Sequence, residues 1–493
     1  MTTLSSPPAE KRSIVEAGGI EAIPLDRRHG SPWQLLATWT APNLEFATVY
    51  VGIIAVAFFG LGFWPAMGAL VLGNLLGSVT QGILSSWGPR DGVAQMVLGR
   101  TAFGTRGNIL PAALNTVMAG LGWFATNSVS GAFALTSLTS IPIWLSLLII
   151  VIVQVAVAFI GHDLVQGFER YASIVLGVIF LLATVFAIAS GHLAGGAHGG
   201  PGGMTAGFGG FTVAVAAAFG YAAGWNPYAT DYARYLPART SPVKTGVAAF
   251  LGDFVSCTVL MAAGAAAATV VDFGAGTPTD LFASTAVMPL IIGKLTLLAI
   301  CVGAIAANAL NIYSGAMSFL AAGVRIPFTL RRAIVAVGFG VVGFFIALAA
   351  SADPKGTYEN FLLVIAYWIA PWLGVVLADR YMRRGTRIAA FLADDARYAN
   401  WPGFIALIVG IVVSIWLFSN QTLYTGLLVG PTETISHGFV ADYGLGDLTP
   451  LVGFVLAAVI YVALFPVFKP RLGGALPKDG FEVPAHTDAA ETA

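Results

Sequence analysis

The sequence predicts an all-α polytopic membrane protein with twelve transmembrane helices. Of its 493 residues, 57% are hydrophobic and only 10% are charged, a composition typical of membrane proteins and unlike that of soluble domains. Apolar stretches of about 20 residues, the length that crosses the hydrocarbon core, recur along the whole chain. Basic residues concentrate in alternate connections between these stretches. Together these observations predict the fold class.

Each predicted span is an apolar run bounded by polar or turn-forming residues. The polar stretch ahead of the first span lacks the apolar core and cleavage site of a signal peptide, so we expect the first span to be retained. The spans cover residues 35–59, 62–85, 108–136, 141–160, 167–190, 210–235, 243–271, 286–320, 331–351, 359–379, 401–420 and 449–468.

The basic residues predict the orientation, because Lys and Arg accumulate in short cytoplasmic loops. With the N-terminus inside, 22 of the 24 basic residues fall in segments expected in the cytoplasm, and only Lys294 and Lys355 lie elsewhere. We therefore expect a multi-pass protein of the plasma (inner) membrane with both termini cytoplasmic. The predicted regions are a cytoplasmic N-terminal tail (1–34), two five-helix units (35–190 and 210–379), two additional transmembrane helices (401–468) and a cytoplasmic C-terminal tail (469–493).

Two spans are interrupted by residues that break helices. The sixth carries Asn226-Pro227 inside an apolar run, and the first carries Pro42-Asn43, followed closely by the ionisable Glu45. Proline lacks an N–H and frees backbone groups nearby, which a bilayer tolerates only where they line a cavity within the protein. Paired interruptions of this kind predict the substrate site of a secondary transporter.

The interruptions recur with nearly constant spacing. Asn43 and Asn226 are 183 residues apart, and Asn127 and Asn311 are 184 apart. These offsets predict that spans one to five and six to ten are structural repeats. The alternative is that the two similar offsets are coincidental.

Aromatic and amide residues gather near the breaks. Trp123 and Asn127 are four residues apart on span three and share a helix face, while Trp225 adjoins Gly224 at the break of span six. Two indoles could sandwich a planar ligand, and amides such as that of Asn311 could read its edge. In the alternative interpretation, the tryptophans are interfacial anchors and the asparagines join helices. Their depth within the spans favours a site.

Three carboxyl groups are candidates for proton transfer. Glu45 and Asp253 lie inside spans, where an ionisable group is costly without a function or a partner. Glu169 begins span five, where a solvated helix start is an equal alternative. At the cytoplasmic end of span six, Asp231 and Arg234 could close an inner gate, although a charged side chain reaching the interface explains them equally well.

Several other classes of function are disfavoured. The 24 basic and 24 acidic residues balance, so nothing indicates a nucleic-acid partner, and no protein partner is evident. Both cysteines lie within apolar spans, where we predict neither a disulfide nor a metal site. An intramembrane enzyme would need paired buried catalytic groups, and the adjacent Asp394 and Asp395 fall in a cytoplasmic loop. We therefore expect a transporter with no catalytic residue and no cofactor beyond a coupling cation; a channel is disfavoured by the broken spans.

Four motifs carry a family resemblance: WNPYATDYARYLP in span six, W-x-x-x-N in span three, GHDLVQGFERYA before span five, and NALNIYSGAMSF in span eight. Together they resemble the purine–cytosine permease branch of the nucleobase–cation symport family. The resemblance implies a LeuT-type 5+5 inverted repeat plus two C-terminal helices. It also implies import of a nucleobase, cytosine and/or purines, by cation symport and alternating access. Allantoin, hydantoin or a thiamine precursor remains an alternative substrate.

The resemblance also implies site residues. By motif these are Trp123, Asn127, Gly224, Trp225 and Asn311, with Asn308 one turn before it, and Glu169 as the acidic position; the first break adds Asn43 as a substrate-binding candidate. Sodium-coupled members carry helix-eight hydroxyls shortly before the substrate amide, whereas the run Cys301–Ala307 has none. We therefore favour the proton over sodium, through Glu169, Glu45 or Asp253.

Overall fold

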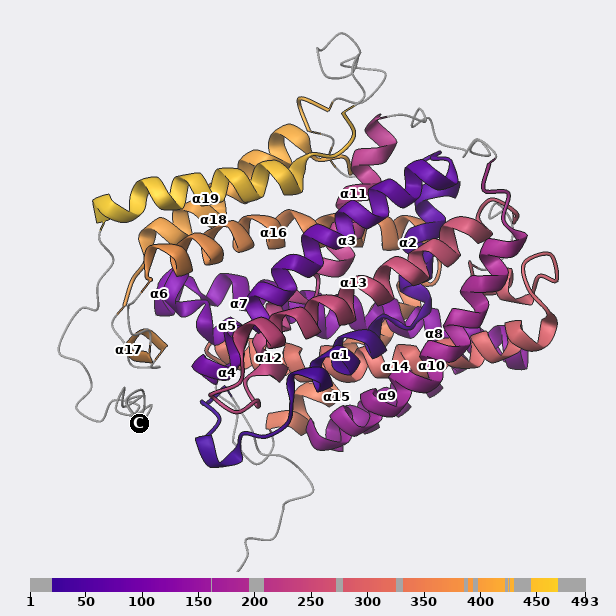
Figure 1. Ribbon diagram of the computed structural model, residues 1–493, viewed down its shortest axis with the longest axis horizontal. Helices are drawn as coiled ribbons and strands as arrows, with labels where there is room; N and C mark the ends of the chain where they lie inside the picture. The colour runs from indigo at the N-terminus through magenta and orange to yellow at the C-terminus, as the bar shows by residue number, and fades with distance from the viewer. Residues whose placement is uncertain are drawn as a thin grey trace, which may run out of the picture.

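The computed structural model describes residues 20–160, 162–194, 208–271, 278–324, 331–384, 389–392, 398–421, 424, 426–429 and 445–468, with side chains left out at 158–173, 331–336, 354–355 and 389–390. The regular elements in this part of the chain are all helices, apart from one isolated β-bridge between Gly104 and Ala399. They form one elongated bundle (Figure 1).

A helix lies at each of the twelve predicted spans. In order these are α1 (Pro32–Thr40) with α2 (Phe46–Ala57), α3 (Phe63–Ser85), α7 (Ile109–Val117) with α8 (Phe124–Thr139), α9 (Ile143–Ile160), α10 (His162–Ser190), α11 (Phe208–Ala223) with α12 (Ala229–Ala233), α13 (Pro242–Ala267), α14 (Leu290–Ala321), α15 (Arg331–Ala350), α16 (Pro354–Met382), α18 (Trp401–Phe418) and α19 (Thr449–Phe468). Short elements connect them: η1 (Leu25–Arg27), α4 (Gly88–Asp91), α5 (Gln95–Leu98), α6 (Arg100–Gly107), η5 (Pro278–Ala283) and α17 (Ala389–Leu392).

The helices have the length and apolarity of membrane spans. Among the described residues, eight helices meet both criteria, and the bent pair α1 and α2 makes a ninth if counted as one span. Shorter apolar helices cover Ile143–Val157, Ile174–Ser190 and Val337–Ala350, within predicted spans four, five and nine. A helical polytopic membrane protein is thus confirmed, while twelve crossings stay a prediction.

The core consists of closely packed helices that carry small residues at their contacts. A Cβ on Gly52 of α2 would lie 1.9 Å from the Met261 carbonyl oxygen of α13, and one on Gly264 would lie 1.8 Å from that of Val49. Only glycine allows the two backbones to approach this closely, as in other membrane helix pairs. Outward-facing side chains are apolar, such as Phe345, which is 64% exposed on α15. This apolar outer surface is typical of a protein that is surrounded by lipid.

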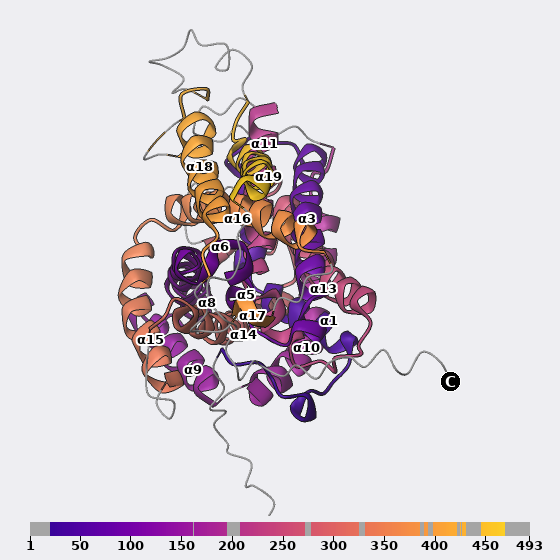
Figure 2. The same ribbon diagram turned by 90° about the vertical axis from the view of Figure 1, so that its left-hand side faces the viewer.

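The two C-terminal helices lie outside the main bundle. α18 and α19 pack against each other and against α16, and both views place them together at one edge (Figures 1 and 2). Both broken spans lie among the helices before them.

Candidate functional site

The breaks in the first and sixth predicted spans lie against each other. In the first, α1 and α2 are bent by 61° around the 3-10 turn η2, Ala41–Asn43. In the sixth, the 3-10 turn η4, Asn226–Tyr228, separates α11 from α12. Trp225 Nε1 donates a hydrogen bond to Asn43 Oδ1 at 2.9 Å. The two interruptions therefore form one polar region inside the bundle.

Side chains bond the backbone groups exposed by the first break. The carboxylate of Glu45 accepts the Ala47 N–H at 2.9 Å and so caps α2. The Thr48 hydroxyl approaches both the Asn43 carbonyl oxygen and the Tyr221 hydroxyl at 2.5 Å. Because buried side chains bond these backbone groups, the geometry of the break is fixed within the protein.

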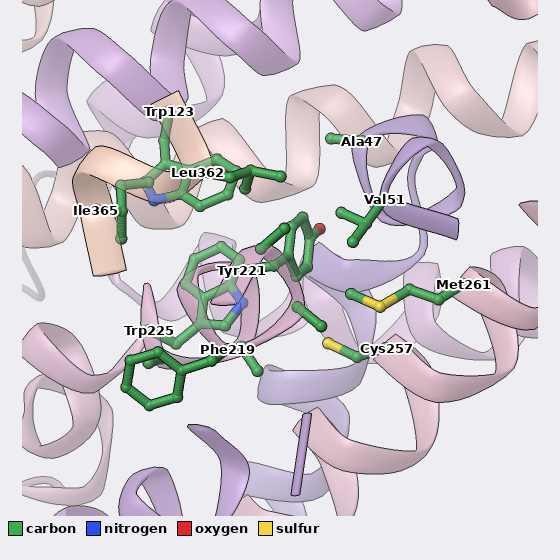
Figure 3. Close-up of a cluster of buried hydrophobic side chains, with 14 of the residues drawn as sticks. Ala47, Val51, Trp123, Phe219, Tyr221, Trp225, Cys257, Met261, Leu362 and Ile365 are labelled. Carbon is green, nitrogen blue, oxygen red and sulfur yellow. The ribbon is translucent and has the colours of Figure 1, made fainter. Parts of the chain in front are cut away.

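Trp123 and Trp225 form a parallel aromatic pair (Figure 3). Their ring centroids are 6.3 Å apart and their planes differ by 7°. A flat ligand between two rings needs about 7 Å between their planes, twice the contact distance of carbon atoms, so the rings must separate to admit one. Gly224 allows the present spacing, because a Cβ there would lie 3.0 Å from Trp123 Cζ2. The structure thus brings three predicted site residues together.

A buried amide cluster joins α8 to α14. Asn127 Nδ2 and Asn311 Nδ2 both donate to Asn308 Oδ1, each at 3.2 Å. The side-chain oxygens of Asn127 and Asn311 are buried and have no hydrogen-bond partner among the described residues. Unpartnered buried acceptors are costly, so these two oxygens are the groups of the cluster best suited to a ligand. Asn308 is fully bonded to protein groups and acts through its neighbours.

Asn43 is also fully engaged by the protein. Its Nδ2 donates to the Trp39 carbonyl oxygen at 2.9 Å, to Asp253 Oδ1 at 3.2 Å and to Ser256 Oγ at 3.0 Å. Its oxygen accepts from Trp225, as described above. The predicted substrate-binding residue Asn43 therefore positions Trp225 and connects it to a carboxylate.

Two of the three predicted carboxyl groups lie near the breaks. Asp253 is fully buried on α13 and accepts the Ser78 hydroxyl of α3 at 2.8 Å. Glu45 accepts the Tyr221 hydroxyl at 3.1 Å. Neither carboxylate forms an ion pair among the described side chains. Glu169 lies in α10, outside the residues whose side chains are described.

The third span contains a π-helical segment that was not predicted. Met118–Trp123, η3, is wound more loosely than the α-helices on either side and ends at Trp123. Such segments are frequent at functional sites. This one turns Trp123 relative to α7, so the indole contacts Tyr221 of α11 while the amide of Asn127 on α8 bonds Asn308 of α14.

Arg234 follows α12, at the end of the sixth predicted span. Arg234 is fully buried, so the interpretation of a side chain reaching the interface is wrong. Its Nη2 donates to the Tyr313 hydroxyl at 3.1 Å, and its Nη1 donates to the Glu21 carbonyl oxygen at 3.4 Å. Asp231 Oδ1 accepts the Gln95 N–H of α5 at 2.9 Å. Charged residues thus join α12 to α14, α5 and the N-terminal segment.

Sequence reasoning missed four residues of this region. Tyr221 and Thr48 contact Glu45 and the first break, while Gln154 and Ser128 support Asn308. Gln154 could have been noticed from the sequence, since it is the only amide in predicted span four, where Ser146 is the only other polar side chain. Tyr221 and the hydroxyl residues carried no such signal, because these residue types are common within membrane helices.

Known proteins resemble the chain over nearly its whole length. YxlA of Bacillus subtilis (strain 168), named as an inferred purine-cytosine permease, is 30% identical over 93% of this chain and 97% of its own. The purine-cytosine permease fcyB of Emericella nidulans is 28% identical over 92% and 88%. These relatives are permeases, so the expectation of a transporter that is not an enzyme is confirmed.

A solved structure shares the fold. Mhp1, a nucleobase-cation-symport-1 family transporter with bromovinylhydantoin bound in a closed conformation, superposes with a TM-score of 0.69 at 18% identity, covering 92% of this chain and 96% of its own. A profile of the family described as "Permease for cytosine/purines, uracil, thiamine, allantoin" matches residues 22–446. The predicted resemblance is confirmed: the chain belongs to this family of permeases.

Proposed function

We propose that the protein imports a nucleobase, cytosine and/or a purine, by cation symport through alternating access. The observation that carries the proposal is the parallel indole pair of Trp123 and Trp225 on a chain that also presents two buried, unpartnered amide oxygens. Stacking holds the flat face of a base, at roughly 1 to 3 kcal/mol per ring, and the amides of Asn127 and Asn311 read its edge. Gly224 lets the rings approach each other.

Related heterocycles are the second candidate substrates. The hydantoin permease of Microbacterium maritypicum is 27% identical, but over only 35% of this chain. The purine-cytosine permeases match over 90% of this chain or more. This broader similarity favours a nucleobase over hydantoin, allantoin or a thiamine precursor.

The proton is the favoured coupling ion. The α14 backbone packs on the first break at Gly303, where a Cβ would lie 2.2 Å from the Leu44 carbonyl oxygen. The run Cys301–Ala307 offers no hydroxyl there, whereas sodium prefers several oxygen ligands. Glu45 and Asp253 are buried carboxyls beside the same break, and Glu169 remains a third candidate.

The proposed topology places the protein in the plasma (inner) membrane with both termini in the cytoplasm. Residues 35–190 and 210–379 form inverted repeats, each with its broken helix first, and 401–468 add two peripheral helices. The contact between the two breaks supports this arrangement, since the site of such transporters lies between the repeats.

The test is uptake of radiolabelled cytosine into cells that lack their own nucleobase carriers. Unlabelled adenine, hypoxanthine, uracil and allantoin compete, while pH and sodium are varied. We expect saturable cytosine uptake that rises with external acidity, and loss of uptake in Trp225→Ala and Asn127→Ala at normal membrane insertion. Uptake of allantoin alone, or strict sodium dependence at every pH, would overturn the substrate or the coupling ion respectively.

A further inference from the structure

The amide cluster is anchored at a backbone carbonyl that fixes the direction of its hydrogen bonds. The Ser128 hydroxyl donates to the Phe124 carbonyl oxygen at 2.6 Å within α8. A carbonyl oxygen can only accept, so the single proton of the Ser128 hydroxyl is committed to this bond. The Ser128 oxygen is therefore an acceptor towards every other neighbour.

Gln154 of α9 connects Ser128 to Asn308 and fixes the direction of the next hydrogen bond. Its Nε2 donates to Ser128 Oγ at 2.5 Å, so its Oε1 must face the other way, and it accepts from Asn308 Nδ2 at 2.9 Å. Asn308 Nδ2 also donates to the Phe124 carbonyl oxygen at 2.9 Å and lies 3.2 Å from Ser128 Oγ. All of these polar side chains are fully buried. Water therefore does not compete for the bonds.

The orientation of Asn308 sets that of the two amides beyond it. With its nitrogen held by Gln154 and Phe124, Asn308 Oδ1 accepts from Asn127 and Asn311. Both of these residues must present nitrogen to Asn308, which leaves their oxygens as the unpartnered atoms. The cluster offers a ligand two acceptors. The connected hydrogen bonds prevent the amide groups of Asn127 and Asn311 from rotating by 180°, which would exchange their oxygens and nitrogens.

We propose that Gln154 and Ser128 are positioning residues that set the hydrogen-bond polarity of the site and make it select ligands with N–H donors. The proposal rests on the function proposed above. An exocyclic amino group has two N–H bonds and can satisfy both oxygens, whereas an oxo group in the same place would face them with lone pairs. Cytosine and adenine carry the amino group; uracil and hypoxanthine carry oxygen.

The discrimination between ligands follows from the free-energy cost of leaving buried acceptors without hydrogen bonds. A ligand without the donors leaves both oxygens unbonded, which weakens binding by about 10-fold to 100-fold. Gln154 bonds Ser128 and Asn308, so its effect on selectivity passes through the amide cluster. A merely structural role would lower the affinity for all bases equally.

The experiment measures competition by cytosine, uracil and pyrimidin-2-one on purified, reconstituted protein. Pyrimidin-2-one lacks the amino group, so it separates the loss of a donor from repulsion by an added oxygen. Gln154→Met removes the hydrogen bonds at similar volume, and Ser128→Ala removes the anchor. Gln154→Glu is the matched control in its protonated form, because the carboxyl C=O still accepts from Asn308 and the carboxyl O–H donates to Ser128 Oγ in place of the amide N–H. Folding is checked by thermal unfolding of each variant.

In the wild type we expect cytosine to bind at least tenfold more tightly than uracil or pyrimidin-2-one. Gln154→Met and Ser128→Ala should reduce this ratio about tenfold, while Gln154→Glu keeps it within about twofold. Unchanged ratios in folded Gln154→Met and Ser128→Ala proteins that still bind bases would overturn the polarity proposal alone. If folded wild-type protein binds no base, the proposed function fails and this inference fails with it.

Discussion

Trp225 and Asn43 are joined by a hydrogen bond of 2.9 Å between the two broken spans. The same Asn43 amide donates to the buried carboxylate of Asp253 at 3.2 Å. One asparagine therefore links a titratable group on α13 to an aromatic ring of the proposed base site. A change in the charge of Asp253 would alter the bonds of Asn43 and, through them, the position of the ring.

The contributions of stacking and hydrogen bonding at Trp225 can be separated by two substitutions. Trp225→Phe keeps an aromatic face but leaves Asn43 Oδ1 without its donor, so base affinity should fall about tenfold, or ~1.4 kcal/mol. Trp225→Ala also loses the stack and should fall on the order of 100-fold. Equilibrium binding of radiolabelled cytosine measures both. Trp416→Phe, at an exposed α18 residue, is the control; equal affinity in Trp225→Phe and wild type would mean that the hydrogen bond is dispensable.

Proton coupling is tested by neutralising the buried carboxyls one at a time. Asp253→Asn and Glu45→Gln retain an acceptor for Ser78 or Tyr221 but cannot release a proton. If either residue carries the coupling proton, its variant should lose accumulation driven by a pH gradient while retaining exchange of base in proteoliposomes. Asp280→Asn, at an exposed acid, is the control. Full accumulation in both buried-site variants would contradict a coupling role for Asp253 and Glu45 and leave Glu169 as the remaining candidate.

Arg234 is expected to hold closed the side of the site that we propose faces the cytoplasm. Lysine lacks the forked guanidinium that bonds Tyr313, Tyr235 and the N-terminal segment together, so Arg234→Lys should open this side. A cysteine introduced at the buried Ser314 of α14 reports the change, because both natural cysteines are buried. Labelling by an impermeant maleimide from the cytoplasmic side should increase several-fold.

Arg90→Lys is the matched control for this experiment, since Arg90 is on the same side and its side chain is 63% exposed. Unchanged labelling in Arg234→Lys would show that other contacts close the site.

Low pH should stabilise the folded segment around Asp447, which precedes α19. Burial raises the pKa of Asp447, although the Tyr367 hydroxyl and the backbone N–H groups of Thr449 and Asn420 oppose the shift. Because the folded pKa exceeds the unfolded value of about 3.9, the folded state takes up the proton first as the pH falls. The stabilisation is complete below the unfolded pKa and is lost as the pH rises through the folded pKa.

The measurement compares unfolding temperatures of wild type and Asp447→Asn in detergent between acidic and neutral pH. The wild type should gain a few degrees relative to Asp447→Asn as the pH falls. A difference between the two proteins that is constant across pH would contradict a raised pKa at Asp447.

The broken spans could be predicted from sequence because Pro42 and Pro227 act locally on their own helices. The meeting of Trp123, Trp225 and Gly224 followed from their depth in apolar spans together with the family motifs. The roles of Asn43 and Asn308 could not be predicted, since an amide looks the same in sequence whether it contacts a ligand or another side chain. Which partner it contacts is decided by helices far apart in the chain.

The π-helical segment before Trp123 has a consequence for the whole third span. Asn115 bonds Ser318 of α14 at 2.7 Å, and Asn127, twelve residues later, bonds Asn308 of the same helix. In an unbroken α-helix these asparagines would point about 120° apart; one extra residue in the wide turn reduces the angle to about 20°. Deleting one residue of Met118–Trp123 would leave the two asparagines eleven positions apart, and an ordinary α-helix would then also hold them about 20° apart. The alignment of the two halves would survive that deletion, whereas deleting a second residue would turn one half by about 100° against the other.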